Sequence, residues 1–240
     1  MNAPLNFPLA QIDYPDSDGR RMAENTLQFQ WIMTLQGGMD DLFRDNPDVF
    51  IAGDLLWYAV EGKVKRRTAP DVMVVFGRPK GRRGSYKQWV ENGIAPQVVF
   101  EVLSPGNRPT GMAKKLLFYE TYGVEEYYIY DPDDVKLTGY KRNSDGLFSP
   151  IPNTNGYTSP RLGIKFDMSG EELVVVRPDG QQFLTYLELA QQKAEAEQRF
   201  AEAEQRVAAE KQHSATLAHN LEQMRAKMLA AGLDPDADGT

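Results

Sequence analysis

The chain has 240 residues, which is enough for one sizeable core domain and an appendage. It contains no cysteine, so disulfides, thiolate metal sites and cysteine nucleophiles are excluded. Both histidines, His213 and His219, lie in a polar C-terminal stretch, which removes most histidine-based catalysis from the folded part. The formal net charge of -7 argues against a protein that coats nucleic acid, although local basic patches can still select a partner.

The sequence offers no sign of a membrane or export segment. No apolar run approaches the ~18 residues that a spanning helix needs. The N-terminus lacks the basic start and apolar core of a signal peptide. These features predict a soluble, cytoplasmic protein with no membrane partner.

The first part of the chain predicts an arm, a helix and a hairpin. Residues 1–20 are rich in Pro, Asp and Gly and predict an extended N-terminal arm. Residues 22–43 carry apolar side chains at helical spacing, although Gly37 and Gly38 weaken the middle. Residues 49–52 and 55–60 resemble strands, and Gly53-Asp54 between them predicts a tight hairpin.

The middle of the chain predicts buried strands around one helix. Residues 71–76 and 97–103 are apolar enough to be buried strands, and residues 77–93 form a charged loop between them. A helix over 111–122 ends at Gly123, and short strands follow at 126–130, 136–141, 163–166 and 173–176. The order predicts an α/β domain over residues 21–183, with a mixed β-sheet core flanked by helices.

The composition changes at residue 184, where a heptad-like repeat rich in Ala, Glu, Gln and Arg begins. A frame of alternating three- and four-residue steps runs from Leu189 to Met228, with polar side chains at three of its positions. Residues 184–232 therefore predict a long helix that self-associates as a coiled coil, and the alternative is a lone solvated helix. Residues 233–240 predict a frayed tail.

Two acids stand at buried strands, thirty residues apart in the sequence. Asp71 follows Pro70 at the start of one strand, and Glu101 interrupts the otherwise apolar run of another. A buried carboxylate needs a partner, because an unpaired buried charge costs several kcal/mol. Two such acids, with the main-chain carbonyl of Val102, form a site of the kind that Mg²⁺ prefers.

Phosphodiester hydrolysis also needs a cation or proton donor beside the metal, and Lys115 on the following helix can supply it. The alternative is structural: Glu101 forms an ion pair with Lys114 or Lys115, and Asp71 caps a turn.

The order of several short blocks makes the sequence recognisable. These are Pro70-Asp71, Glu101 to Pro105, Lys115 with Tyr119, and Tyr122 to Tyr127. Together they resemble the Uma-two family, described as restriction endonucleases with the PD-(D/E)XK nuclease fold. The likeness covers about residues 20–180 and implies a restriction-endonuclease-like mixed sheet.

The resemblance implies a role for four residues. Asp71 and Glu101 are the implied metal ligands, Lys115 the catalytic lysine, and Glu24 an auxiliary acid on the first helix. The general pattern places the lysine two residues after the glutamate, where this chain has Leu103, and an acid four residues before Lys115, where it has Gly111. The implied cofactor is Mg²⁺, with Mn²⁺ as an alternative, and the implied substrate is double-stranded DNA.

Basic side chains cluster on both sides of the strand that begins at Asp71. Because phosphate contacts come chiefly from Lys and Arg, these clusters predict contact with a nucleic-acid backbone, and the alternative is a solvated flexible loop. The predicted nucleic-acid-binding residues are Lys65, Arg66, Arg67, Arg78, Lys80, Arg82, Arg83 and Lys87.

The sequence therefore predicts a metal-dependent endonuclease that hydrolyses DNA, working as a homodimer through its C-terminal helix. A second hypothesis is a catalytically inactive DNA- or protein-binding module on the same fold, which Gly111 and the absent strand lysine favour. A third is a phosphoesterase acting on nucleotides or RNA.

Overall fold

The computed structural model describes residues 13–16, 25–107 and 109–231. The chain divides into two compact units, Met1–Tyr186 and Leu187–Thr240, close to the boundary predicted between residues 183 and 184. Most of the predicted N-terminal arm and all of the predicted tail over 233–240 lie outside the described residues. The arm is described at residues 13–16, where Tyr14 contacts the ring of Tyr58 and Pro15 accepts a hydrogen bond from the Tyr58 hydroxyl.

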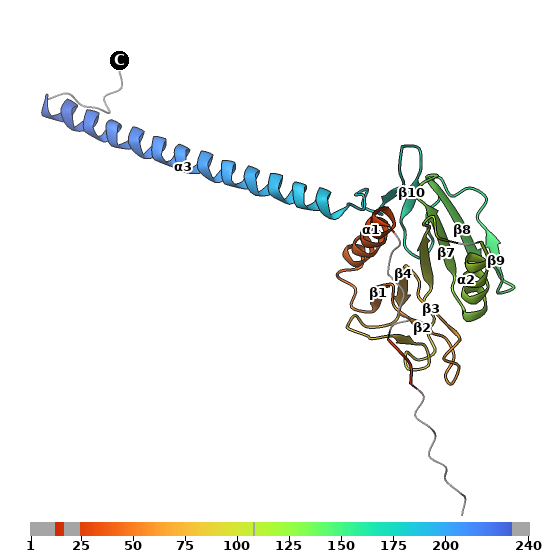
Figure 1. The fold of residues 1–240 in the computed structure, drawn as a ribbon. Coiled ribbons are helices and arrows are strands. Elements are labelled where there is room, and N and C mark those ends of the chain that lie inside the picture. The colour runs from red at the N-terminus through yellow and green to blue at the C-terminus, as the bar shows by residue number, and fades with distance from the viewer. Residues whose placement is uncertain (1–12, 17–24, 108, 232–240) are drawn as a thin grey trace, which may run out of the picture. The chain divides into compact units, whose positions relative to one another are not determined.

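A six-stranded mixed sheet forms the centre of the first unit (Figure 1). Neighbouring strands are antiparallel except for β6 and β7, which run parallel. In spatial order the strands are β1 (Val49–Gly53), β4 (Val72–Phe76), β6 (Val98–Val102), β7 (Glu126–Asp131), β8 (Lys136–Arg142) and β9 (Phe148–Pro150). The predicted mixed sheet flanked by helices is confirmed.

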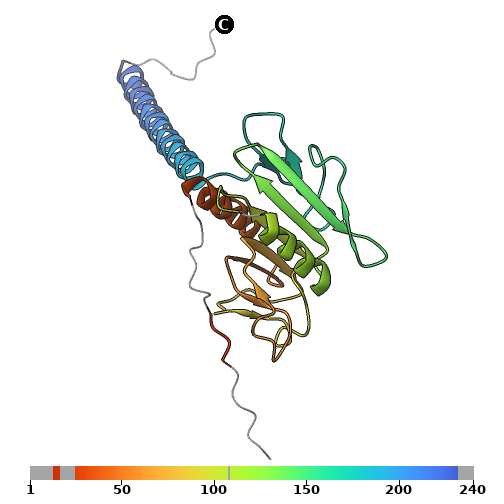
Figure 2. The same ribbon diagram turned by 45° about the vertical axis from the view of Figure 1, so that its right-hand side comes forward.

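The parallel pair requires a crossover, because parallel strands cannot be joined by a tight turn. Helix α2 (Pro109–Tyr122) makes that crossover between β6 and β7, and Figure 2 shows it in green near the long strands β7 and β8. Pro109 suits the first helical turn, where its missing N–H has no partner to lose. The helix ends at Gly123, whose φ of 99° is a backbone conformation that glycine adopts readily, so the predicted stop is confirmed.

Helix α1 (Thr26–Leu42) covers one face of the sheet. Asn25 caps it by accepting the Gln28 main-chain N–H at 2.7 Å. Its apolar side chains join a core with alternate residues of β1, β4 and β6. Gly38 lies under the ring of Phe183, and a Cβ built there would lie 2.3 Å from that ring. Glycine in mid-helix therefore permits a close contact with residues just before the end of the first unit.

The opposite face carries a second core, in which Trp57, Tyr86 and Tyr119 are fully buried. A small three-stranded sheet contributes to this core, with β2 (Trp57–Tyr58) between β3 (Arg67–Thr68) and β5 (Tyr86–Lys87). The sheet therefore separates an α1 side from an α2 side.

The hairpin predicted at Gly53-Asp54 is wrong. β1 pairs with β4, whereas β2 pairs with β3 and β5, so the chain leaves one sheet and enters another at this turn. Asp54 adopts a positive φ of 47°, and its N–H points to the carbonyls of Pro70 (3.1 Å) and Asp71 (3.3 Å). The turn therefore holds the segment that leads into β4.

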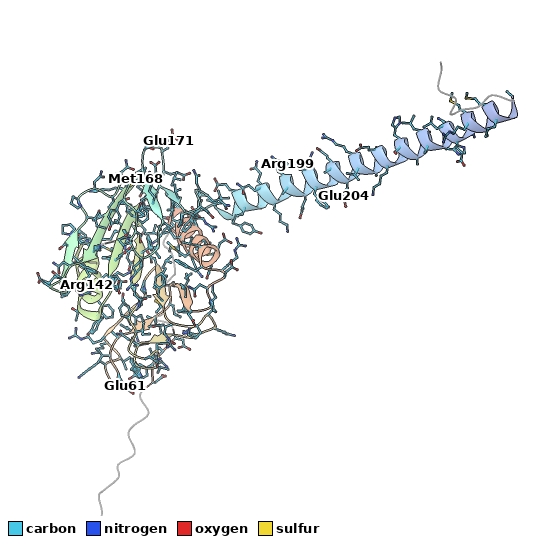
Figure 3. The ribbon with its side chains drawn as sticks, turned by 180° about the vertical axis from the view of Figure 1, so that it is seen from behind. Glu61, Arg142, Met168, Glu171, Arg199 and Glu204 are labelled. Carbon is cyan, nitrogen blue, oxygen red and sulfur yellow. The ribbon has the colours of Figure 1, made fainter. Side chains whose placement is uncertain are left out.

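Two short strands and one long helix complete the described chain. β10 (Lys165–Asp167) and β11 (Val174–Val176) form an antiparallel pair whose apolar side chains join the core on the α1 side. Helix α3 (Tyr186–Ala230) has no buried residue, and Figure 3 shows side chains such as Arg199 and Glu204 standing out from it. No helix in the described part of the chain is long and apolar enough to cross a membrane.

Glu91 organises the charged segment between β4 and β6. Its carboxylate pairs with Arg78 (Nε–Oε2 2.8 Å) and with Arg83 (Nε–Oε1 2.7 Å), and all three side chains are largely buried. The Arg83 guanidinium also lies 3.9 Å from the centre of the Phe50 ring. Hydrogen bonds from Arg83, opposed by burial and aided by Arg78, lower the pKa of Glu91. The segment is therefore tied to the core rather than free in solvent.

Substitution of the two helical glycines separates backbone propensity from packing. Gly37→Ala meets no atom within 4 Å, so we expect it to raise the free energy of unfolding by about 0.5–1 kcal/mol. Gly38→Ala collides with the Phe183 ring, so we expect a loss of about 1–3 kcal/mol. Urea denaturation of both variants measures the difference, and equal effects would contradict the packing role of Gly38.

Glu91→Gln removes the charge that two guanidinium groups face. We expect it to lower the free energy of unfolding at pH 7 by about 1–3 kcal/mol. Because the pKa of Glu91 is lowered in the folded state, its stabilisation is complete above the ordinary glutamate pKa of about 4.3 and is lost as the pH falls through the folded pKa. Wild type and variant should therefore converge in stability in acid. Denaturation curves between pH 7 and pH 3 test this, and a constant difference would refute it.

Candidate active site

The register of the sheet brings Asp71 and Glu101 side by side. β4 and β6 are antiparallel with Val72 opposite Phe100, so one further step along the ladder sets Asp71 opposite Glu101. Directly opposed side chains lie on the same face of a sheet, about 5 Å apart at Cβ. Both residues are buried, with exposures of 8% for Asp71 and 2% for Glu101. The two predicted metal ligands therefore meet on the α2 side of the sheet.

Asp71 is held by the main chain of the neighbouring strand. Its Oδ2 accepts the N–H of Val102 at 2.7 Å. Burial, followed by the negative charge of Glu101, raises the pKa of Asp71 well above its usual range, against the opposing effects of Lys115 and the Val102 N–H. Burial is thus the main cause of the raised pKa, and the neighbouring carboxylate of Glu101 adds to it.

Glu101 receives two donors from one face of α2. The ammonium of Lys115 lies 2.6 Å from its Oε2, and the hydroxyl of Tyr119 donates to its Oε1 at 2.5 Å. Residues four apart project from the same side of a helix, so the crossover delivers both groups together. The general pattern places a lysine at position 103, but here Leu103 donates its N–H to the Tyr130 carbonyl, and the ammonium beside Glu101 comes from the helix.

Lys115 also donates to the main-chain carbonyl of Ala69 at 3.3 Å. Burial disfavours its charged form, but Glu101 and Asp71 outweigh burial and raise its pKa. The negative charge of Asp54 also raises the pKa of Lys115, so the turn after β1 lies close to the site. The site thus combines two buried carboxylates with one ammonium.

Sequence reasoning missed three contributors to this arrangement. Gln28 on α1 donates from its Nε2 to the Val102 carbonyl at 2.8 Å, and Tyr119 and Asp54 were not assigned a role in it. Gln28 is a buried polar residue on the apolar face of α1, one turn before Trp31 and Ile32, and that pattern could have identified it. The spacing of Tyr119 four residues after Lys115 was a signal for its position beside Glu101, whereas the contribution of Asp54 depends on the tertiary fold and leaves no comparable signal.

The donor set fits a hard divalent cation. Two adjacent buried carboxylates face only one ammonium, and a divalent cation would offset the remaining charge. In the described ranges, no group of three or more His, Asp or Glu side chains is arranged to hold a metal. A site here would therefore use two carboxylates, the Val102 carbonyl and exogenous oxygens, which is the set that Mg²⁺ commonly takes.

The structural alternative also receives support, because the ion pair between Glu101 and Lys115 forms directly. Lys114, the other predicted partner, is exposed. Glu24 lies outside the described residues. Gly111 is exposed on the first turns of α2 with nothing within 4 Å of an added Cβ.

The eight predicted nucleic-acid-binding residues fall into two kinds. Lys65, Arg66, Lys80 and Arg82 are exposed. The other four have partners within the fold. Arg78 and Arg83 pair with Glu91, Arg67 donates to the Tyr58 hydroxyl at 3.1 Å, and the ammonium of Lys87 lies 5.2 Å from the centre of the Tyr14 ring.

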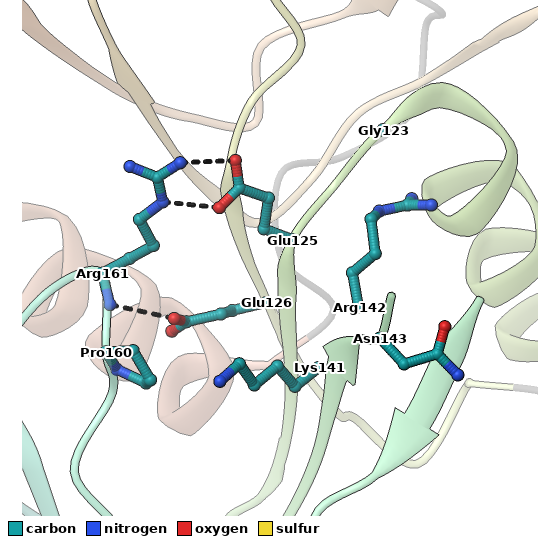
Figure 4. Close-up of a pocket in the computed structure, with 8 residues that line it drawn as sticks. All are labelled: Gly123, Glu125, Glu126, Lys141, Arg142, Asn143, Pro160 and Arg161. Carbon is teal, nitrogen blue, oxygen red and sulfur yellow. Dashed lines mark hydrogen bonds and ion pairs between the residues drawn. The ribbon is translucent and has the colours of Figure 1, made fainter. Parts of the chain in front are cut away.

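A pocket of about 620 Å³ lies at the other end of the β6–β7 pair, beside Glu126 rather than Glu101 (Figure 4). Arg161 forms a bidentate ion pair with Glu125 there, with Nε–Oε2 at 2.5 Å and Nη2–Oε1 at 2.6 Å. The buried Glu126 carboxylate accepts two hydroxyl groups and the main-chain N–H of Arg161. These contacts join the start of β7 to the segment before β10, and none of the predicted site residues lines this pocket.

Comparison with known proteins supplies the family. The Uma2 family model, described as "Putative restriction endonuclease", matches residues 34–169, a range that contains Asp71, Glu101 and Lys115. A solved structure from Anabaena variabilis ATCC 29413, described as "a putative nuclease belonging to DUF820", is 15% identical with a TM-score of 0.43 over 57% of this chain and 72% of that one. No curated protein matches the chain significantly. Because the family model covers more than half of the sequence, the chain belongs to the Uma2 family of restriction-endonuclease-like proteins.

Proposed function

We propose that this chain is a metal-dependent endonuclease that hydrolyses phosphodiester bonds in double-stranded DNA. One observation carries the proposal: two buried carboxylates on adjacent strands converge with a single helix-borne ammonium. A structural core gains little from such an arrangement, because each buried charge costs several kcal/mol. Membership of a nuclease family supports the same reading.

Asp71, Glu101 and the Val102 carbonyl would hold Mg²⁺, and Mn²⁺ is an acceptable substitute. When bound, the cation supplies charge neutralisation at the phosphoryl oxygens and a lowered pKa for an attacking water. Gln28 fixes the Val102 carbonyl from the α1 side, and Tyr119 fixes Glu101 from the α2 side. Both are positioning residues, because they act through the groups that would touch the metal.

Lys115 would act on the scissile phosphate or orient the attacking water. An ammonium has three N–H donors, and in the described part of the chain two of them are taken by Glu101 and Ala69. The third is available to a phosphoryl oxygen, where a fixed positive charge stabilises the developing negative charge.

The exposed cations would track the DNA backbone. Lys65 and Arg66 come just before β3, and the chain then runs through Ala69 and Pro70 into Asp71. We propose Lys65, Arg66, Lys80 and Arg82 as the main phosphate contacts. Arg67 and Lys87, which are partly buried, would make secondary contacts. Arg78 and Arg83 are left out, because both are largely buried and already form ion pairs with Glu91. A cytoplasmic location stays a prediction.

The inactive binding module remains the second candidate. It is favoured by Gly111, which stands where the family pattern has an acid, and by the direct Glu101–Lys115 pair, which a metal would have to loosen. Metal binding without cleavage of any nucleic acid would support this candidate over the nuclease.

Metal binding and cleavage can be separated with two variants of the site. We expect Mg²⁺ or Mn²⁺ at 100 times its Kd to stabilise the wild type by about 2.7 kcal/mol. Asp71→Asn should lose that increase while being at least as stable without metal, because it removes the charge that faces Glu101. Lys115→Met should keep the increase in stability, because it removes the ammonium that competes with the metal for Glu101. It should cleave plasmid DNA at least about 100-fold more slowly than wild type, because the positive charge at the phosphate is lost.

Thermal unfolding with and without metal and a plasmid-nicking assay supply the two measurements. Asp133→Asn, an exposed acid outside the site, serves as the matched control and should behave as wild type. Equal nicking by wild type and Asp71→Asn would defeat the proposed mechanism.

Contact between the exposed cations and the DNA phosphates predicts that duplex affinity falls with added salt. We expect Lys65→Ala combined with Arg66→Ala to weaken duplex binding for every sequence and to reduce the slope of log affinity against log salt by about 2. Fluorescence anisotropy without divalent cations measures binding while cleavage is prevented. The control removes two exposed lysines of the strands β8 and β10, Lys136 and Lys165, with the same change of net charge. An identical slope for the two double variants would argue against contact at residues 65 and 66.

A further inference from the structure

Helix α3 carries an apolar seam that nothing in the described chain covers. Its 45 residues make a helix of about 68 Å with no buried side chain. The larger apolar side chains of the seam in its middle and C-terminal parts are exposed by 38–66%. These are Phe200, Val207, Leu217, Leu221, Met224 and Met228. Leu229, also exposed, lies outside the seam. Long helices in proteins draw most of their stability from packing of such a face, so a partner of matching shape is required.

The seam follows a strict heptad frame with two alternating core positions. The first position of each heptad, a, holds Lys193, Phe200, Val207, Ser214, Leu221 and Met228. The fourth position, d, holds Leu189, Ala196, Ala203, Glu210, Leu217 and Met224. The frame is uneven, because the small alanines Ala196 and Ala203 occupy d in the N-terminal half, whereas from Leu217 to Met228 leucine and methionine fill both positions.

We propose that the seam pairs with the seam of a second copy of this chain in the antiparallel direction, centred at residue 212. Antiparallel coiled coils pack a against d of the partner. This centre sets Ala196 opposite Met228 of the second copy, and Ala203 opposite its Leu221. Each small side chain then faces a large one, and the layers fill evenly.

The polar core positions select the same arrangement. With this centre, Glu210 faces Ser214 of the second copy, whose hydroxyl can donate to the carboxylate. Lys193 falls beyond Met228 of the second copy and stays in solvent. A parallel pair in register would instead bury Lys193 against Lys193 and Glu210 against Glu210, and like charges in a core layer are strongly unfavourable.

Flanking charges do not decide the direction, so the core layers must. The antiparallel pair brings Glu197 near Arg225 of the second copy, and Arg199 near its Lys227. The charge of Arg199 is partly compensated within its own helix by Glu195 at 3.6 Å. The antiparallel pair also brings Lys211 near Lys211 of the second copy at the centre, which is repulsive. A parallel pair would give one attractive and one repulsive contact per helix, Arg199 with Glu204 and Arg206 with Lys211. The flanking charges therefore do not favour the antiparallel direction, and the proposal rests on the core layers.

The paired length is sufficient for a stable dimer. The overlap from residue 196 to residue 228 is about 50 Å long and about 10 Å wide, so the pair covers roughly 1,000 Å² in total. The residues between 186 and 195 leave about 15 Å of helix between the overlap and the first unit of the same copy. The two copies of Tyr186 then lie roughly 80 Å apart along the pair.

The absence of cysteine in the chain allows a direct test by disulfide exchange. Full-length Ala203→Cys and Leu221→Cys are made separately, one with a size tag, and are mixed in a glutathione redox buffer. We expect the mixed disulfide to exceed either homodimeric disulfide by at least about tenfold. Homodimeric disulfides formed by each variant alone would show a parallel pair and overturn the proposal. A monomer or trimer by sedimentation equilibrium would overturn it as well.

A distance measurement on the same chain gives an independent readout. Spin labels on Gln191→Cys, which points away from the seam, should lie about 60 Å apart in the antiparallel pair and less than about 20 Å apart in a parallel pair. Neither measurement involves DNA or metal. A protein that fails to cleave can therefore still show antiparallel pairing, and the proposed function and this inference fail separately.

Discussion

The interior of the first unit must accommodate two carboxylates that one ammonium does not fully neutralise. Asp71 and Glu101 lie opposite each other on adjacent strands, and burial, followed by the charge of Glu101, raises the pKa of Asp71. Much of the surrounding structure compensates for the buried charge. The N–H of Val102 and the hydroxyl of Tyr119 each bind a carboxylate oxygen, and the turn at Asp54 binds the main chain just before β4.

The main elements of the fold could be predicted because their signals are local. Runs of apolar residues locate β4, β6 and β7, and the glycine after α2 marks the end of that helix. The error at Gly53-Asp54 arose because a turn signal says that the chain reverses but not which strand it then pairs with. The short strands β3, β5 and β9 were missed, since two or three residues carry no readable period.

The centre of the candidate site could also be predicted, because an acid inside an apolar strand is costly enough to be conspicuous. Glu101 was found this way, Asp71 was found at the start of a buried strand after Pro70, and Lys115 followed from its place on the next helix. The charged segment after β4 was harder. Arg78 and Arg83 resembled phosphate ligands because no acid lies among them, yet Glu91 just beyond the cluster binds both. Sequence shows how many charges are present, whereas only the fold shows which of them are already neutralised.

Delivery of the lysine by α2 rather than by β6 changes how relatives of this chain can be recognised. In a strand-borne arrangement, glutamate and lysine form a fixed short signature, and each constrains the other during evolution. Here Leu103 contributes its main-chain N–H to the sheet, and that contact does not require a particular side chain. Searches that demand an acid and a lysine two positions apart would overlook such proteins. A pattern that links the acid to a lysine and a tyrosine one helical turn apart, on the crossover that follows, would retrieve them.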